Sequence, residues 1–190
     1  GEKAEAAESA EEAAAKLAKK KEAYASLGML VPVNKEAPPP AGLITDQSGA
    51  TSVTLRKNVL RGGGGGGGSG GGMLLTDCAR GFVKENSVTD ARGCGVVVGA
   101  GADPDLVSNV VSGAVEAAVR VADGGRGRFS NNTLEQSGGA GVVIEKGGNP
   151  DLRANAVRDN GAEGLLVRGG GGRLSANSFV RNGAAGVALL

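Results

Sequence analysis

Residues 129–144 read FSNNTLEQSGGAGVVI, and residues 152–167 read LRANAVRDNGAEGLLV, which is the same pattern 23 residues later. Each copy places an apolar residue three positions before an asparagine, another two positions after it, and a glycine nine positions after it. An apolar triplet follows the glycine directly. A fixed period of this kind is the signature of a repeat architecture. Most of the chain is therefore expected to be one structural unit copied along its length.

The repeated asparagine occurs six times, at intervals of 28, 23, 23, 23 and 22 residues: Asn58, Asn86, Asn109, Asn132, Asn155 and Asn177. The first interval is longer because it contains the glycine-rich tract 62–72, which we interpret as a loop insertion. The first triplet, 73–75, follows that tract, and the later triplets are 96–98, 119–121, 142–144, 165–167 and 187–189.

A repeat of 22–23 residues is too short for helix–turn–helix units, which need more than about 30 residues. The apolar residues alternate over short stretches, the triplets are rich in β-branched residues, and Gly, Asn, Asp and Ser separate them. These features predict two or three short strands per coil, joined by tight turns. The expected fold is all-β, a right-handed, single-stranded parallel β-helix of about six to seven coils over 42–190. Its coils would lie about 4.8 Å apart.

Three positions of the repeat have a predicted structural role. The asparagine is expected to adopt the left-handed backbone conformation at a corner and to form a ladder of stacked amides. The small residue nine positions later is expected to leave room where the chain enters the triplet. The position four before the asparagine alternates in sign, which predicts a neutral ladder that fixes register rather than a binding site: Asp105, Arg128, Asp151 and Arg173.

Residues 1–27 differ from the repeats because they are rich in Ala, Glu and Lys, with acids early and bases late. This distribution complements a helix dipole, so one N-terminal α-helix is predicted. Residues 28–41 contain four of the six prolines and are predicted to be a linker. Gly42-Leu43-Ile44 is interpreted as a degenerate first triplet. The chain has no initiator Met and ends directly after a triplet, so we expect it to be a piece of a longer protein.

Composition limits the possible functions. The net charge is +1, so neither nucleic acid nor a membrane is an expected partner, and no apolar run reaches the length of a membrane span. Histidine is absent, and Cys78 and Cys94 occupy different positions of the repeat. No metal or other cofactor is therefore expected. Free thiols fit a reducing compartment, which favours a cytoplasmic or other intracellular location.

Because parallel β-helices often act on polysaccharides, acidic residues that share a column are candidate catalytic residues. Asp77 and Asp123 share a column two coils apart, with Ala100 between them. Their separation of about 9.6 Å is at the far end of the range for an inverting carboxylate pair. No third acid and no arginine joins them in the column, so we expect no catalytic site and interpret the protein as a non-enzyme.

The central residues of the triplets are predicted to point outward if their neighbours point inward. Five of the six are apolar: Leu74, Val97, Arg120, Val143, Leu166 and Ala188. This central stripe has three interpretations: strand propensity with mutual covering, a surface covered by the 2–27 helix, or a site for a partner protein.

The segments 124–132, 141–144 and 149–155 resemble the right-handed β-helix repeats of the pectin-lyase-like superfamily. In particular they are similar to the repeats of the β-helix-bearing F-box proteins, which alternate an Asn-Pro-x-Leu-Arg-x-Asn coil with a Gly-Gly-x-Gly coil. The resemblance implies a protein-binding scaffold, in its most concrete form the substrate-binding part of a ubiquitin-ligase adaptor. No F-box is recognisable in residues 1–41. The alternative is a carbohydrate-binding or polysaccharide-degrading protein with Asp77 and Asp123 as its active residues.

Overall fold

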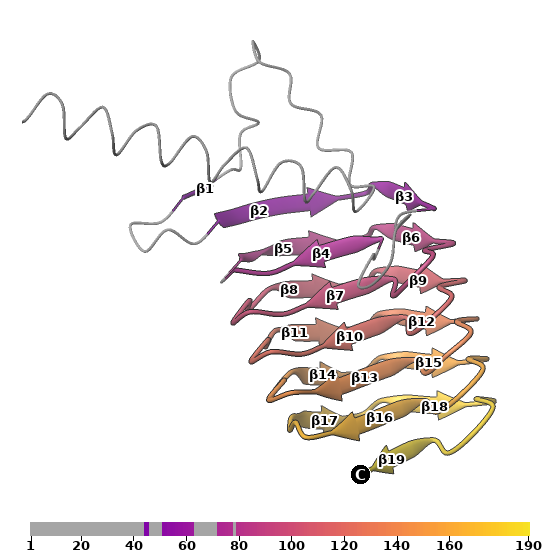
Figure 1. The fold of residues 1–190 in the computed structure, drawn as a ribbon. Coiled ribbons are helices and arrows are strands. Elements are labelled where there is room, and N and C mark those ends of the chain that lie inside the picture. The colour runs from indigo at the N-terminus through magenta and orange to yellow at the C-terminus, as the bar shows by residue number, and fades with distance from the viewer. Residues whose placement is uncertain (1–43, 46–50, 63–71, 78) are drawn as a thin grey trace, which may run out of the picture.

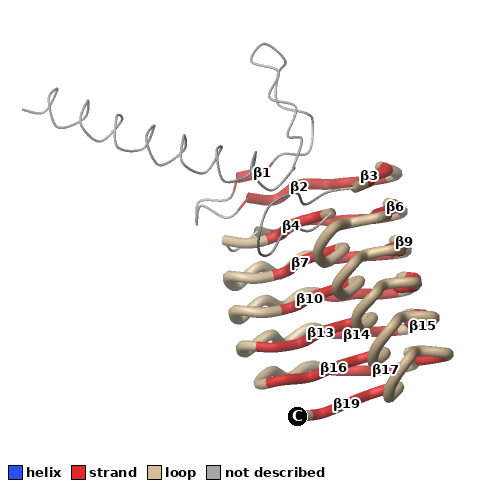
Figure 2. Tube along the Cα trace, turned by 45° about the vertical axis from the view of Figure 1, so that its right-hand side comes forward, coloured by secondary structure: helices blue, strands red, loops and turns tan. Residues whose placement is uncertain are grey.

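The computed structural model describes residues 44–45, 51–62, 72–77 and 79–190, and these form a stack of coils built from three sheets (Figure 1). The predicted 1–27 helix, the 28–41 linker and most of the glycine-rich insertion lie outside the described residues. Each coil contributes one strand to each sheet, and the tube view in Figure 2 shows the coils lying one below another.

Sheet A contains, in order of pairing, β1 (Ile44–Thr45), β2 (Thr51–Arg56), β5 (Arg80–Lys84), β8 (Asp105–Val107), β11 (Arg128–Ser130), β14 (Asp151–Arg153) and β17 (Arg173–Ser175). Sheet B contains β3 (Val59–Arg61), β6 (Ser87–Thr89), β9 (Val110–Ser112), β12 (Thr133–Glu135), β15 (Ala156–Arg158) and β18 (Ser178–Val180). Sheet C contains β4 (Met73–Leu75), β7 (Val96–Val98), β10 (Val119–Val121), β13 (Val142–Glu145), β16 (Leu165–Arg168) and β19 (Val187–Leu189).

Strands from successive coils pair in parallel and in the register that the repeat predicts. In sheet C, for example, Val119 pairs with Val96 on one side and with Val142 on the other. The prediction of an all-β parallel β-helix is therefore confirmed. The stack from β4 to β19 makes about five turns, so the predicted six to seven coils are not confirmed by the described residues.

The exception to parallel pairing is β1, which pairs antiparallel with β2 at the N-terminal edge of sheet A. Ile44 faces Ser52 in this pair. The interpretation of 42–44 as a first triplet is therefore wrong for Ile44, because a triplet strand would join sheet C in parallel. An antiparallel strand instead pairs with the first two residues of β2, Thr51 and Ser52, and covers that part of an otherwise open edge.

The predicted asparagine ladder lies at the turn between sheets A and B. The side chains of Asn86, Asn109, Asn132 and Asn155 are each 2 % exposed. The amide nitrogen of Asn109 donates to Oδ1 of Asn132 at 3.0 Å, and to the backbone oxygen of Val83 in the preceding coil at 2.9 Å. The backbone N–H of Asn109 also donates to that same Oδ1. Each inner rung thus uses both its donors and its acceptor, which is what burial of an amide requires.

The prediction that the asparagine itself is left-handed is wrong. The residue before each asparagine has positive φ, between 54° and 57°: Lys57, Glu85, Ser108, Asn131, Ala154 and Ala176. The physical reason is a division of roles within the turn. One residue bends the chain with its side chain toward solvent, while the asparagine turns its amide along the stack.

A second, shorter ladder follows five residues later and was not predicted. Asn160 accepts the backbone N–H of Ser137 and donates to Oδ1 of Asn182, and its amide also donates to the backbone oxygen of Leu134. Asn160 is as buried as the main rungs. The signal was present in the sequence, because Asn160 and Asn182 both stand five residues after a repeated asparagine.

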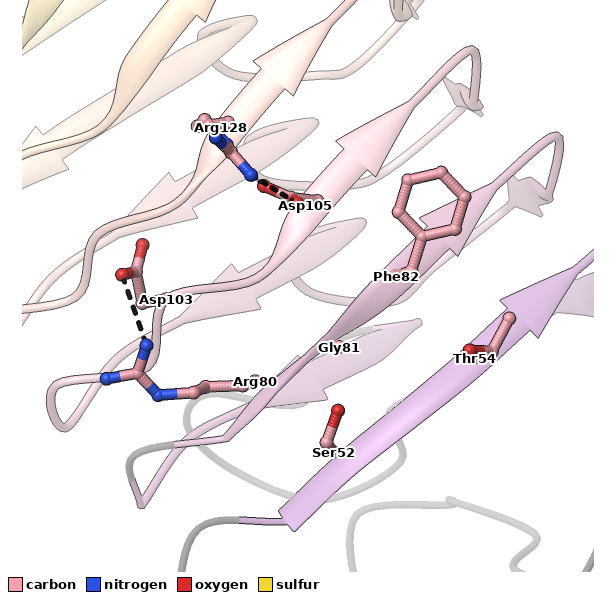
Figure 3. Close-up of a pocket in the computed structure, with 8 residues that line it drawn as sticks. All are labelled: Ser52, Thr54, Arg80, Gly81, Phe82, Asp103, Asp105 and Arg128. Atoms are coloured by element: carbon pink, nitrogen blue, oxygen red, sulfur yellow. Dashed lines mark hydrogen bonds and ion pairs between the residues drawn. The ribbon is translucent and has the colours of Figure 1, made fainter. Parts of the chain in front are cut away.

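The predicted charge ladder of sheet A is in register, with Arg128 between Asp105 and Asp151, and Arg173 beyond Asp151. Its pairing is uneven: Arg128 makes two hydrogen bonds of 2.6 Å to Asp105, whereas Asp151 pairs with Arg153 of its own strand at 3.3 Å. Figure 3 shows the Arg128–Asp105 pair beside a second pair, Arg80 with Asp103.

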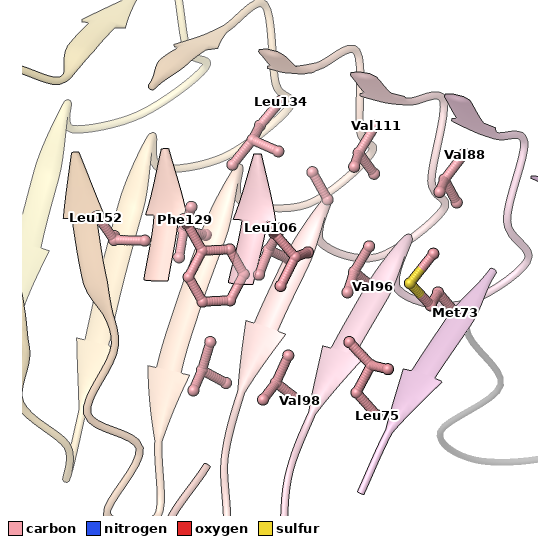
Figure 4. Packing of buried hydrophobic residues seen from close by; sticks show 14 of the residues in the cluster. Met73, Leu75, Val88, Val96, Val98, Leu106, Val111, Phe129, Leu134 and Leu152 are labelled. Atoms are coloured by element: carbon pink, nitrogen blue, oxygen red, sulfur yellow. The ribbon is translucent and has the colours of Figure 1, made fainter. Parts of the chain in front are cut away.

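The core is a column of apolar, mostly aliphatic side chains enclosed by the three sheets. Figure 4 shows them pointing inward from strands of all three sheets. Phe129, Leu106, Leu134 and Ile144 are among its largest fully buried members. Small residues are required where the triplet begins, because a Cβ on Gly141 would lie 2.2 Å from Val157 Cγ1. The predicted role of that position is therefore confirmed.

Candidate interaction surface

The predicted central stripe forms one continuous row on the outer side of sheet C. The register pairs Leu74 with Val97, Val97 with Arg120, Arg120 with Val143, Val143 with Leu166, and Leu166 with Ala188. The structure therefore places the six predicted residues in one row, which spans about five coil spacings, or roughly 24 Å.

The stripe is not a freely exposed ridge. Val97 and Val143 are only 8 % and 9 % exposed, because they pack with Cys94, Ala117 and Ala140 in a second apolar cluster outside the sheet. These three residues lie in the connections between sheets B and C, just before the triplets. The connections stack as the strands do; for example, the N–H of Gly139 donates to the backbone oxygen of Glu116.

Arg120, the charged member of the stripe, is neutralised within the sheet. Its Nε donates to Glu145 Oε1 at 2.7 Å, and the other oxygen of Glu145 lies 3.7 Å from an Nη of Arg168. The side chains of Arg120 and Glu145 are only 24 % and 16 % exposed. Half-buried, doubly contacted pairs of this kind hold their geometry better than exposed pairs do.

A shallow groove of about 380 Å³ runs between this charged row and the B–C connections. Its floor includes Ala117, Ala140, Val143 and Leu166. Its lining also contains the following charged or polar residues: Cys94, Glu116, Arg120, Glu145, Glu163 and Arg168. An apolar floor with charged margins suits a partner that presents both apolar and polar groups. We call this feature the sheet C groove.

Cys94 lies at the groove as an unreactive thiol. It is 3 % exposed, and its Sγ donates to Glu116 Oε2 at 3.3 Å. Burial is the main cause that raises the pKa of Cys94 to about 11, and the neighbouring carboxylate of Glu116 adds to the shift. The thiol therefore stays protonated at neutral pH, and it is a packing residue rather than a nucleophile.

Asp77 and Asp123 lie at the corner that follows sheet C. Both are exposed and have left-handed backbone angles, φ 54° and 50°, and Ala100 and Lys146 have the same conformation in the same column. Aspartate tolerates this conformation better than most residues, so backbone geometry accounts for both positions. Among the described residues, no group of three or more Cys, Asp or Glu side chains is arranged to hold a metal ion.

Sequence reasoning missed the charged members of the groove. Glu145 and Arg168 were not singled out because each follows a triplet, outside the repeated core pattern. Glu116 and Glu163 lie one position apart in the repeat, seven and eight residues after their asparagines, and so form no column. The small residues of the B–C connections do repeat, since Cys94, Ala117 and Ala140 each stand eight residues after an asparagine, but the pattern alone does not show that they pack on sheet C.

Comparison with protein families matches residues 41–190 to the right-handed β-helix region. Because the match covers well over half of the chain, the protein belongs to this family, and the predicted handedness agrees with it. A comparison with curated proteins found no match, and a comparison with solved structures found none either. The described residues contain no helix that is long and apolar enough to cross a membrane.

Proposed function

We propose that this β-helix is a non-catalytic scaffold that binds a partner protein through the sheet C groove. The observation that carries the proposal is the composition of the groove: an apolar floor lined by Val143 and Leu166 lies beside the Arg120–Glu145–Arg168 row. Protein interfaces combine an apolar centre with a polar rim in this way.

The arrangement of charge favours binding over catalysis. Glu145 lies between two guanidinium groups, and the thiol of Cys94, which lines the groove, is protonated at neutral pH. A nucleophilic cysteine acts as the thiolate, whereas burial and the neighbouring carboxylate of Glu116 both keep the thiol of Cys94 protonated. We therefore infer no catalytic nucleophile at the groove. The role implied by the resemblance, a substrate adaptor of a ubiquitin ligase, is the most concrete form of this proposal, and an intracellular location belongs to the same proposal.

Site-specific photo-crosslinking tests the proposal. The crosslinking amino acid p-benzoylphenylalanine would replace Leu166 at the groove or, as the control, Val110, a 40 % exposed residue on sheet B. We expect one discrete protein adduct from position 166 and none from position 110. The adduct should disappear when Glu163→Lys is added, because this change reverses a charge in the groove lining. Equal adducts from both positions, or no adduct from position 166, would contradict the proposal.

A carbohydrate-binding or polysaccharide-degrading protein is the second candidate. It is favoured by the same groove, because carboxylates and guanidinium groups placed side by side can hydrogen-bond to sugar hydroxyls. Its proposed active residues are Asp77 and Asp123, which lie at the corner that follows sheet C and outside the lining of the groove. Calcium-dependent cleavage of polygalacturonate that is abolished by Asp77→Ala or Asp123→Ala would establish this function and replace the scaffold proposal.

A further inference from the structure

The outer face of sheet A carries a much stronger charge than the other two sheets. Its strands contain six basic and two acidic residues, whereas the strands of sheets B and C each contain two arginines and one glutamate. The charged residues of the sheet A strands are Arg56, Arg80, Lys84, Arg128, Arg153 and Arg173, with Asp105 and Asp151. When Arg126 and the two acids that pair with these strands, Glu85 and Asp103, are included, the face holds seven basic and four acidic residues. This excess of three positive charges makes the face a local basic patch, because the whole chain has a net charge of only +1.

The face is also hollowed. Two adjoining troughs of about 500 and 400 Å³ lie along it and share Asp105 and Arg128 in their linings. The first contains Phe82, which is 39 % exposed and stands beside the two ion pairs in Figure 3. An exposed aromatic ring in a hollow is a typical anchor point for a partner.

Two basic groups on this face have no ion-pair partner among the described residues. The guanidinium groups of Arg126 and Arg173 are exposed and make no ion pair there, although Arg128, between them in sequence, is fully paired. A ligand for this face must therefore bring anions for these two arginines.

We propose that the outer face of sheet A binds an acidic polypeptide segment. Carboxylates of the segment would pair with Arg126 and Arg173, and an apolar side chain would pack on Phe82. From β2 to β17 the face extends over five coil spacings, roughly 24 Å, which equals about seven residues of extended chain.

A nucleic acid fits this face less well than an acidic peptide does. Its phosphates form an unbroken row of negative charge, which Asp103, Asp105 and Asp151 would repel along the same face. Single strands also bind through several stacked aromatic rings, whereas Phe82 is the one aromatic residue of the described troughs. A peptide can place its carboxylates between the aspartates.

The test uses a fluorescein-labelled peptide of nine residues, four glutamates alternating with four serines around a central tryptophan, and measures its fluorescence anisotropy with the full chain at low salt. Replacing Arg126 and Arg173 by serine should weaken binding about tenfold, since two exposed ion pairs with the peptide are lost. Phe82→Ala should weaken binding as well. Arg92→Ser is the matched control. Arg92 is exposed, lies in the connection before β7 of sheet C and makes no ion pair among the described residues. The affinity of the Arg92→Ser variant for the peptide should match that of the wild-type chain.

Three results would overturn the proposal. The first is that the peptide does not bind the wild-type chain. The second is that Arg92→Ser weakens binding as much as the double variant does. The third is tighter binding of oligothymidylate or polygalacturonate than of the peptide, with dependence on Arg126 and Arg173, which would assign the face to another class of polymer. None of these outcomes bears on the sheet C groove, so the two proposals fail independently.

Discussion

Asn109 and Asn132 are joined by two hydrogen bonds to a single oxygen: both the backbone N–H and the side-chain amide of Asn109 donate to Asn132 Oδ1, at 2.8 and 3.0 Å. The same arrangement recurs between Asn86 and Asn109 and between Asn132 and Asn155. Each rung therefore fixes the position of the coil before it, and the ladder sets both spacing and register of the stack.

Replacing Asn132 by leucine should destabilise the fold by about 1–3 kcal/mol, because the buried N–H of Asn109 and the backbone oxygen of Leu106 lose their partners. Urea unfolding followed by circular dichroism would measure the change. Asn131→Ala is the matched control, since alanine already occupies this left-handed position at Ala154 and Ala176. A loss of stability in the control equal to that in Asn132→Leu would show that the amide contacts do not stabilise the stack.

Gly141→Ala should destabilise the protein by about 1–3 kcal/mol, because the added methyl group would overlap Val157 Cγ1 and the backbone oxygen of Gly164. Gly99→Ala is its control: a Cβ there meets only the oxygen of Ala122, at an ordinary 3.6 Å. Thermal melting of the two variants gives the comparison. Equal melting temperatures would mean that the tight approach at position 141 is not present in solution.

Alkylation of Cys94 should be slow at pH 8 and should accelerate as the pH approaches 11, because burial raises the pKa of this thiol to about 11. Iodoacetamide labelling of a Cys78→Ser variant, followed by mass spectrometry, isolates this thiol. Because the thiol ionises at lower pH in the unfolded state than in the folded state, a rise in pH favours the unfolded state. Stability from this group is thus complete below the unfolded pKa of about 8.5 and is lost as the pH rises through 11. Rapid labelling at pH 8 in the native state would contradict the burial of Cys94.

Glu145→Gln should lower stability by about 1 kcal/mol, because it leaves the half-buried guanidinium of Arg120 without its carboxylate. Glu163→Gln is the control, since Glu163 lies in the same groove but makes no ion pair among the described residues. Chemical denaturation at low and high salt would measure the difference in stability between the two variants. If the two variants lose equal stability, the Arg120–Glu145 pair does not hold the charged row in place.

The sequence predicted most of the features that repeat with a fixed period, although the ladder of Asn160 and Asn182 also repeats and was missed. The spacing of Asn86, Asn109 and Asn132 predicts stacked coils, because burial of the same amide in every coil imposes the same position. The period also placed Val97 and Val143 on one outer row. It could not show that Cys94, Ala117 and Ala140 cover them, since the path of the B–C connections depends on packing between coils.

The left-handed corners show a second limit of the sequence. Residues as different as Lys57, Ser108, Asn131 and Ala154 occupy the same corner position, so composition does not identify it. The asparagine beside it has a stronger preference for left-handed angles, which led to the wrong assignment. The ladder hydrogen bonds outweigh that preference, because a buried amide without partners costs more than a strained exposed residue.

The sheet C groove, the basic face of sheet A and both asparagine ladders all depend on stacking in register, which electron–electron double resonance can measure directly. Spin labels at Arg61, Thr89 or Ser112, each paired with a label at Val180, report on one column of sheet B. The backbone separations should be roughly 24, 19 and 14 Å, falling by about 4.8 Å for each coil. Distances that do not fall in equal steps along this series would contradict the coil stack and every surface built on it.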